Sequence, residues 1–470
     1  PLIEAARHAI PVIARDIPIF REVAGEAAFY FSGDKATELA GAMQSWLALH
    51  KQGQHPKSEA MRWLTWQQSA EKLKVALVEQ HYPRRQLLVD ISELVQRDSR
   101  TGIQRVVRSV LKEWLENPPD GFRVEPVYAT LAQPYWYARK FAAQFTGAPS
   151  GALQDDPIDF SPGDIFFALD LQPQVQTAHA GFFQHLRQQG VAVKFLVYDL
   201  LCILQPEHFP TGSAEGLSSW LQVVGETDGA VCISQAVADE LNDWMGARAW
   251  KRLRPFQLAA NPLGADVDGS APTRGLPAKA QDVLATLSLR PSFLMVGTLE
   301  PRKGHVQVLD AFEHLWDSGK DINLVIVGKH GWMVDHVAER LRSHSEWGKR
   351  LFWLEGISDE YLEKLYAAST CLIAASYGEG FGLPLIEAAQ HQLPIIARDI
   401  PVFREVAGEH AFYFDTVNPE GLALCISEWL SLYTDGKHPQ SLNITWLTWK
   451  KSAARLMQHV LERNTVQLAL

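Results

Sequence analysis

A long internal repeat constrains the fold of this chain more than any other feature of its sequence. The segment that starts PLIEAARHAIPVIARD at Pro1 recurs as PLIEAAQHQLPIIARD at Pro384, and the match continues without a gap to Glu79 and Glu462. The offset is 384 − 1 = 383 residues, whereas the repeats of solenoid proteins are about 20–50 residues long. The repeated unit is therefore a whole module, and we expect one complete copy preceded by the tail of another.

Residues 1–83 are interpreted as the carboxy-terminal remnant of a preceding module. The chain has no initiator Met and begins inside a segment that the second copy identifies as a helix, so we expect a fragment of a longer tandem protein. The alternative, a functional domain in its own right, is disfavoured because this segment lacks the strands that precede its counterpart.

The composition excludes several classes of protein. Apolar residues make up 47% and charged residues 21% of the 470 residues, as in ordinary globular proteins of two to four domains. A net charge of −10 argues against a partner whose phosphates must be neutralised, so no nucleic acid is expected. No apolar run reaches the roughly 18 residues of a spanning helix, which indicates a cytoplasmic protein. Four cysteines without a CxxC pair indicate buried free thiols: Cys202, Cys232, Cys371 and Cys425.

The complete copy alternates short apolar runs with helical patterns. QLLVDIS (86–92) and GDIFFALD (163–170) are two such runs, and helices between buried strands are typical of parallel sheets. A Gly-, Pro- and Ala-rich stretch at 261–280 interrupts the alternation and is interpreted as a linker. The pattern predicts an α/β fold with two doubly wound, Rossmann-like domains that face a cleft. The predicted ranges are 84–268 and 269–445, with residues 446–470 as a helix crossing back to the first domain.

Two adjacent cations follow the first apolar run of the second domain. Arg302 and Lys303 come directly after SFLMVGT (292–298), where strands of a doubly wound sheet present their ligand-binding ends. Fixed positive charge there suits a diphosphate leaving group, because negative charge grows on it as a glycosidic bond breaks. The alternative is an ordinary solvated helix start.

The segment SYGEGFGLPLIEAA (376–389) is the most informative motif. Its glycines allow the backbone to approach a ligand closely, and Pro384 suits the first turn of a helix whose free N–H groups point into the loop. Glu379 lies in the loop and Glu387 about one turn into the helix, on the face of Pro384. Two carboxylates could therefore address one ligand.

These residues resemble the retaining glycosyltransferases of family 4, which have the GT-B fold. Glu379 and Glu387 match the E-x7-E motif of that family, and Arg302-Lys303 match its pair on the donor diphosphate, with the resemblance covering residue 86 to the end. It implies that Glu379 contacts the transferred sugar and that Glu387 holds the ribose hydroxyls. Further donor-binding residues are implied by position: Phe381, Gly382 and Leu383 through backbone N–H groups, Gly356 and Ile357 on the nucleotide base, and Gly328 and Lys329 at the preceding strand end.

In the first domain, SRTGIQRVV (99–107) resembles the family's loop and helix beneath the acceptor and the donor phosphate. Its candidate acceptor-side residues are Thr101, Gly102 and Arg105, joined by Tyr198 and Asp199 at a later strand end. Many relatives have His where this chain has Tyr198, and a tyrosine is a poor proton shuttle near pH 7; the alternative role is packing at the cleft wall. Ser234 is interpreted as a helix N-cap.

The tandem arrangement is similar to that of the multidomain mannosyltransferases that polymerise polymannose O-antigens in Gram-negative bacteria. The resemblance implies GDP-mannose as donor, a growing lipid-linked oligosaccharide as acceptor, an α-1,3 linkage in preference to α-1,2, and no cofactor. A membrane-recruiting or chain-length-regulating protein partner is also expected, at the inner face of the cytoplasmic membrane. The alternatives are a hexosyltransferase that uses a UDP-sugar and a non-catalytic glycan-binding or scaffold module.

No metal site is expected. Asp266 and Asp268 form a D-x-D pair, but this pair lies in the predicted linker. The histidines show neither HExxH nor Cys/His ligand spacing. The tryptophans of WLTW at 446–449 are better explained by a helix that packs across both domains than by a carbohydrate platform.

Overall fold

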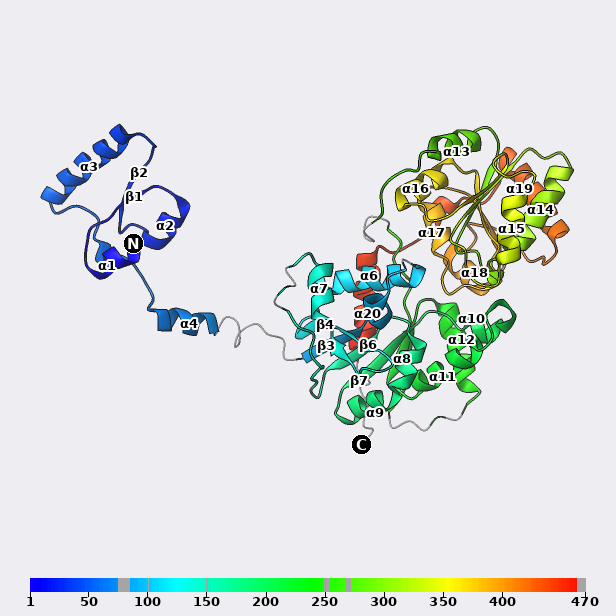
Figure 1. Ribbon diagram of the computed structural model, residues 1–470, viewed down its shortest axis with the longest axis horizontal. Coiled ribbons are helices and arrows are strands. Elements are labelled where there is room, and N and C mark those ends of the chain that lie inside the picture. The colour runs from blue at the N-terminus through cyan, green and yellow to red at the C-terminus, as the bar shows by residue number, and fades with distance from the viewer. Residues whose placement is uncertain are drawn as a thin grey trace. The chain divides into compact units, whose positions relative to one another are not determined.

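The computed structural model describes residues 1–74, 85–99, 101–148, 151, 153–248, 250, 254–266 and 272–462. The chain divides into two compact units, Pro1–Tyr82 and Pro83–Leu470. Each unit is described by itself below (Figure 1).

The second unit begins with a seven-stranded sheet in the order β5-β4-β3-β6-β7-β8-β9. Its pairs are parallel except β4 with β5, and helices cover both faces (Figure 1). The strands are β3 (Arg85–Asp90), β4 (Phe122–Tyr128), β5 (Trp136–Tyr137), β6 (Ile165–Ala168), β7 (Ala192–Val197), β8 (Gly229–Cys232) and β9 (Gln257–Ala260). The helices are α5 (Ser92–Gln96), α6 (Gly102–Glu116), α7 (Arg139–Phe145), α8 (Pro173–Ala178), α9 (Ala180–Gln188), α10 (Leu201–Leu204), α11 (Ser213–Gly225) and α12 (Gln235–Gly246), with a 3-10 turn η3 (Pro206–His208).

A six-stranded, all-parallel sheet follows in the order β12-β11-β10-β13-β14-β15. Numbered along the chain this order is 3-2-1-4-5-6, the doubly wound arrangement whose direction reverses between its first and fourth strands. The strands are β10 (Ser292–Val296), β11 (Asn323–Val327), β12 (Leu351–Leu354), β13 (Cys371–Ala374), β14 (Ile395–Arg398) and β15 (Phe412–Phe414). The helices are α13 (Ala280–Leu287), α14 (His305–Asp317), α15 (Asp335–Ser343), α16 (Asp359–Ala368), α17 (Leu383–Gln390), α18 (Pro401–Ala407) and α19 (Pro419–Thr434), with 3-10 turns η5 (Pro301–Lys303) and η6 (Ser441–Asn443).

The two parallel sheets confirm the predicted α/β class with two Rossmann-like domains. The strands are nearly continuous runs of buried apolar residues, as expected for strands covered on both faces. The four cysteines are free; three are buried and Cys425 is half-buried.

The last described helix, α20 (Trp449–Leu461), packs on the first α/β domain, beside α6. Trp449 is fully buried there, and Trp114 Nε1 donates a hydrogen bond to the carbonyl of Ala453 at 2.9 Å. Lys194 on β7 donates from Nζ to the carbonyls of residues 459, 460 and 462 at the end of the helix. A buried ammonium thus satisfies carbonyls that a helix C-terminus leaves free.

The first unit repeats the segment 384–462 of the second unit element by element. Its elements are α1 (Leu2–Arg7), β1 (Ile13–Arg15), α2 (Pro18–Ala24), β2 (Phe29–Phe31), α3 (Ala36–Lys51), η1 (Ser58–Ala60) and α4 (Trp66–Lys74). Adding 383 to the first and last residue numbers of α2, β2, α3 and η1 gives those of α18, β15, α19 and η6, respectively. The strand register is also shared, because Ile13 pairs with Phe29 as Ile396 pairs with Phe412.

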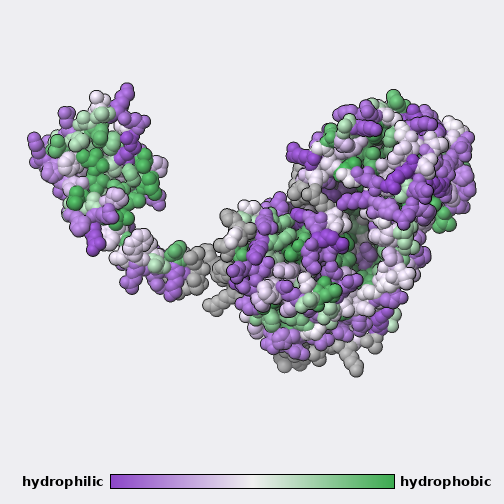
Figure 2. Space-filling view, viewed as in Figure 1, coloured by the Kyte–Doolittle hydropathy of each residue, from purple (hydrophilic) through white to green (hydrophobic). Residues whose placement is uncertain are grey.

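The two copies differ in burial. Trp66 is 91% exposed, whereas its counterpart Trp449 is 0% exposed. Met43 on α3 is 50% exposed, whereas its counterpart Ile426 is fully buried. Hydrophobic residues accordingly show on the surface of the first unit (Figure 2). The repeat therefore preserves the local structure of this segment without the surroundings that bury its apolar faces in the second copy.

Candidate active site

The carboxyl ends of β10 and β13 bring the predicted charged residues together. The turn η5 with Arg302 and Lys303 follows β10, and the loop with Glu379 follows β13. These strands are neighbours at the point where the strand order reverses, which is where ligands bind in open α/β sheets. The backbone N–H of Tyr377 also donates to the carbonyl of Arg302 at 2.8 Å, so the loop and η5 form one structure.

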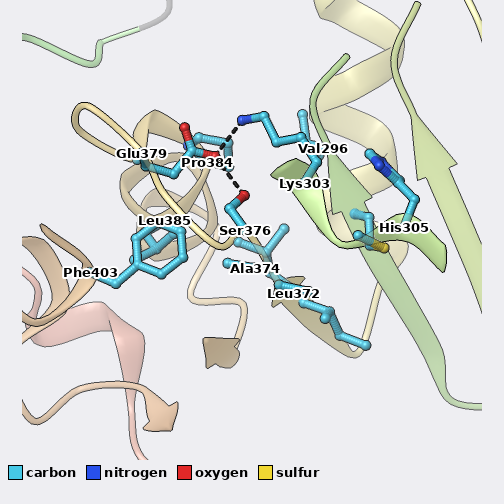
Figure 3. A pocket seen from close by; sticks show the side chains of 14 residues that line it. Val296, Lys303, His305, Leu372, Ala374, Ser376, Glu379, Pro384, Leu385 and Phe403 are labelled. Carbon is cyan, nitrogen blue, oxygen red and sulfur yellow. Dashed lines mark hydrogen bonds and ion pairs between the residues drawn. The ribbon is translucent and has the colours of Figure 1, made fainter. Parts of the chain in front are cut away.

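Glu379 is the centre of this cluster. Lys303 Nζ donates to Oε1 of Glu379, and Ser376 Oγ donates to the same oxygen at 2.6 Å (Figure 3). Arg302 Nη1 donates to Oε2 at 3.0 Å. Burial alone would raise the pKa of Glu379, but the charges of Lys303 and Arg302 outweigh that effect and lower it to about 2. Glu379 is therefore an ionised, fixed carboxylate at every physiological pH.

Arg302 has two further partners besides Glu379. Its Nε pairs with Oε2 of Glu300 at 2.9 Å, and its Nη1 also donates to the carbonyl of Gly378 at 3.1 Å. Two carboxylates thus balance two cations in a half-buried cluster, which keeps the cations in place before any anion arrives.

His305 is a site residue that the sequence reasoning missed. It begins α14 two residues after Lys303 and is buried; burial, with the charge of Lys303, lowers its pKa to about 3. The imidazole is therefore neutral beside the cations. The sequence signal that could have identified His305 is its position directly after Lys303 and Gly304. Gly304 itself has φ +73, and a Cβ there would lie 2.5 Å from the carbonyl oxygen of Ala375, so the close approach of η5 to β13 requires glycine.

A cavity of about 20 Å³ lies beneath the loop, lined among others by Lys303, His305, Ser376 and Glu379 (Figure 3). This volume suits about one water molecule and is far too small for a nucleotide-sugar. The surface is hollowed where the two α/β domains meet (Figure 2). That hollow is the place open to a larger ligand.

The glycines of the loop approach the first domain closely. A Cβ at Gly380 would overlap the carbonyl oxygen of Tyr198, and Ser234 Oγ donates to the carbonyl of Gly380 at 2.8 Å. Gln205 Nε2 likewise donates to the carbonyl of Tyr377 at 2.9 Å. The sequence predicted that these glycines admit a ligand. In this structure Gly380 admits the backbone of the opposite domain and Gly378 admits the side chains of Leu201 and Gln205 from that domain, whereas Gly382 faces Phe403 of its own domain.

Glu387 lies on α17, the helix that follows the loop. Arg105 Nη1 from the first domain donates to its Oε1 at 2.6 Å, and Tyr366 Oη donates to its Oε2 at 2.7 Å. Arg105 was predicted on the acceptor side, but its partner is the carboxylate predicted for the donor ribose. Tyr366 was not identified from the sequence, because nothing in its surroundings on α16 marks it as polar and functional.

The remaining residues predicted to bind the donor lie near the same edge of the sheet. Gly382, with φ +100, is the N-cap of α17, so Leu383 opens the helix, while Phe381 is buried against both domains. The other two pairs follow neighbouring strands, Gly356 and Ile357 after β12, Gly328 and Lys329 after β11. Lys329 Nζ donates to the carbonyl of Ser99 in the first domain at 2.9 Å.

The residues predicted on the acceptor side have separate roles. Thr101 caps α6, whose first residue is Gly102, by accepting from the N–H of Gln104. Tyr198 is buried, and its hydroxyl donates to the carbonyl of Leu169 at 2.9 Å, which favours packing over contact with a sugar. Asp199 is half-buried; burial raises its pKa, while Arg302 opposes that rise.

Ser234 caps α12, as predicted, by accepting from the N–H of Val237 at 3.2 Å. Among the described residues, no group of three or more His, Cys, Asp or Glu is arranged to hold a metal ion. Asp266 accepts from the N–H of Trp449, and Asp268 lies outside the described residues. Within the part of the chain that the structure describes, no helix is long and apolar enough to cross a membrane.

Comparison with known proteins identifies the family. Residues 282–443, which contain both η5 and the loop of Glu379, match the family described as glycosyl transferases group 1. Residues 282–443 of the chain therefore belong to this family. The serotype-specific mannosyltransferase WbdA of Escherichia coli is 47% identical over 379 residues, which are 80% of this chain and 45% of WbdA. The O-antigen chain mannosyltransferase B of Escherichia coli is 28% identical over 163 residues, 33% of this chain and 42% of that protein.

Solved structures agree with the fold. Sucrose-phosphate synthase from Thermosynechococcus elongatus superposes with a TM-score of 0.57 at 16% identity, covering 80% of this chain and 98% of that one. Anabaena HepE in complex with UDP and glucose gives 0.55 at 17% identity, covering 82% and 100%. At such identities the likeness shows the fold alone, which is GT-B, as the family resemblance implied. The chain spans about half the length of the curated relatives it matches.

Proposed function

We propose that this chain is a retaining α-mannosyltransferase that transfers mannose from GDP-mannose to a growing lipid-linked mannan of an O-antigen polysaccharide. The observation that carries the proposal is the cluster of Glu379, Arg302 and Lys303 at the switch point of the second sheet. The mannosyltransferase relatives support the choice of sugar. The α-1,3 linkage, in preference to α-1,2, is part of the same proposal.

Each charged group has a separate task in this mechanism. The ionised Glu379 accepts hydrogen bonds from hydroxyls of the mannose and orients the ring, while Arg302 and Lys303 stabilise the negative charge of the departing GDP. Glu387 holds the ribose hydroxyls. Glu379 is already engaged with both cations, so donor binding exchanges some of these contacts for contacts with the diphosphate.

The transfer step needs no protein nucleophile in a front-face route. The bond between the anomeric carbon and the diphosphate oxygen breaks, the acceptor hydroxyl oxygen bonds to the same face of that carbon, and the acceptor proton passes to the departing phosphate oxygen. Tyr198 is not required as a proton shuttle. This agrees with the hydrogen bond that its hydroxyl donates to the carbonyl oxygen of Leu169. Contact between the two domains around the loop limits the access of water to the reacting carbon.

A transfer assay with matched lysine variants tests the proposal. Lys303→Ala is expected to lower kcat by roughly 10²-fold or more, since loss of a preorganised charge at a developing anion typically costs that much. Lys349→Ala, which removes an exposed lysine of the same domain, is the control and should transfer normally. Near-normal transfer by Lys303→Ala would overturn the assignment of the leaving-group site.

We further propose that residues 1–83 are the non-catalytic tail of a preceding module. Glu4 is the counterpart of Glu387, but its side chain is 83% exposed whereas that of Glu387 is 9% exposed. The exposure of Trp66 and Met43 supports this view. Hydrogen exchange on the full chain should therefore be faster at the amides of α4 than at those of α20; equal protection would contradict it.

The acceptor places the site of action at the inner face of the cytoplasmic membrane. The described residues contain no spanning helix, so we propose that a membrane-recruiting or chain-length-regulating protein holds the enzyme there. Co-sedimentation with vesicles in the presence and absence of membrane proteins distinguishes recruitment by a partner from direct binding to lipid.

A further inference from the structure

One ion pair joins the two α/β domains through a donor-side carboxylate. Arg105 lies in the second turn of α6, in the first domain, and Glu387 lies on α17, in the second. Their closest atoms, Nη1 and Oε1, are 2.6 Å apart, with side chains 23% and 9% exposed. Burial lowers the pKa of the Arg105 guanidinium, but the charge of Glu387 more than compensates and raises it above its ordinary value.

The other oxygen of Glu387 is also fixed. Tyr366 Oη donates to Oε2 at 2.7 Å, and the Tyr366 ring stacks on His391, with ring centroids 5.4 Å apart and nearly parallel planes. Each carboxylate oxygen therefore has one protein donor, whereas an ionised carboxylate offers about four acceptor positions. Glu387 is oriented by both partners and still has capacity for two further hydroxyl donors.

The two donors differ in one respect. Tyr366 belongs to the same domain as Glu387 and stays with it when the domains separate, whereas Arg105 belongs to the opposite domain and does not. Separation would break the charge pair with Arg105 and leave Glu387 with one neutral partner, so its carboxylate would be held less firmly in one orientation. The contact of Lys329 Nζ with the carbonyl of Ser99, just before α6, would break in the same movement.

We propose that Arg105 is a positioning residue that links recognition of the donor ribose to closure of the two domains. The inference rests on the proposed function, in which Glu387 receives the ribose hydroxyls. In the closed form Arg105 and Tyr366 hold Glu387 in its hydroxyl-binding orientation; in the open form Glu387 keeps only Tyr366. Ribose binding and closure therefore favour each other, as thermodynamic linkage requires.

Nucleotide binding by the full-length chain tests this inference. Arg105→Gln should weaken GDP binding by about tenfold or more in calorimetry, because truncating one member of a buried charge pair removes a large interaction. Arg105→Lys should lie between Arg105→Gln and the wild type, since lysine keeps the charge but not the fork geometry. The control is Arg97→Gln, which removes an arginine paired with Glu93 within the first domain and 76% exposed.

A double-mutant cycle separates positioning from general damage to the fold. If Arg105 acts through Glu387, the effect of Arg105→Gln on GDP affinity should nearly vanish in a Glu387→Gln background. Additive effects would overturn the proposal. Tighter GDP binding by Arg105→Gln would also overturn it, because that result would make Arg105 a competitor of the ribose rather than a support for its site.

A distance measurement distinguishes failure of this inference from failure of the proposed function. Spin labels at Asn117 and Ser345, exposed positions on the two domains, report the separation of the domains without any nucleotide. Arg105→Gln should shift the distance distribution toward longer values, and Arg97→Gln should not. If the wild type binds no GDP but the shift occurs, the donor assignment fails while the link between Arg105 and closure stands; if no shift occurs, the link itself is wrong.

Discussion

Neutralising Glu379 is the perturbation that separates its electrostatic role from its shape. Glu379→Gln keeps the size of the side chain and one carbonyl acceptor but removes the charge that balances Lys303 and Arg302. The variant should be less stable than the wild type and should transfer sugar orders of magnitude more slowly. The loss of stability can be estimated from the structure.

The shift in the pKa of Glu379 sets the size of the stability effect. The pKa falls from an ordinary 4.5 to about 2 because Lys303 and Arg302 outweigh the cost of burial. The difference, 4.5 − 2 = 2.5, corresponds to about 3 kcal/mol at about 1.4 kcal/mol per unit. Glu379→Gln should lower the free energy of unfolding at pH 7 by about that amount.

The pH dependence gives the sign of the effect. Because the pKa is depressed in the folded state, the stabilisation from Glu379 is complete above pH 4.5 and is lost as the pH falls toward about 2. Urea unfolding of the wild type and of Glu379→Gln should therefore differ most at neutral pH and converge in acid. The same preparations, assayed for transfer at pH 7, report the catalytic effect.

Two results would refute this reasoning. A Glu379→Gln variant as stable as the wild type at pH 7 would show that the carboxylate does not balance the cations. A variant that is destabilised but transfers normally would show that the cluster is structural only.

Three further predictions concern the surrounding structure. Burial raises the pKa of Asp170 to about 7, so stability should fall as the pH rises from about 4 to about 7, and Asp170→Asn should flatten that slope in urea unfolding. Lys194→Met should cost about 1–3 kcal/mol, because the carbonyls at the end of α20 lose their donor, and amide exchange in α20 should accelerate. Trp449→Ala should cost about 3–5 kcal/mol, whereas the same change at its counterpart Trp66 should leave thermal unfolding within about 0.5 kcal/mol of the wild type.

The fold was predictable because its signals are local. Apolar runs and helical patterns alternate along the chain, and the Gly- and Pro-rich stretch at 261–280 lies between the end of β9 and the start of α13. The cluster at the switch point was accessible for a related reason. Neighbouring parallel strands place their carboxyl ends together, so Lys303 and Glu379 could be expected to meet although 76 residues separate them.

Contacts between the two domains were not predictable from the same signals. Arg105 and Glu387 are 282 residues apart, and strand-end reasoning locates each within its own domain without giving the angle between the domains. The glycines at 378 and 380 indicated a close approach but not its partner, which is the backbone and side chains of the first domain. Tyr198 was placed at a strand end, but the sequence gives no sign of the Leu169 carbonyl that accepts a hydrogen bond from its hydroxyl.

Product analysis tests the central claim most directly. The full chain is incubated with GDP-mannose or with UDP-sugars and a synthetic mannose oligosaccharide, and the product is assigned by NMR. We predict transfer from GDP-mannose, with the new mannose in the α configuration and 1,3-linked. Transfer only from a UDP-sugar, or a β-linked product, would contradict it.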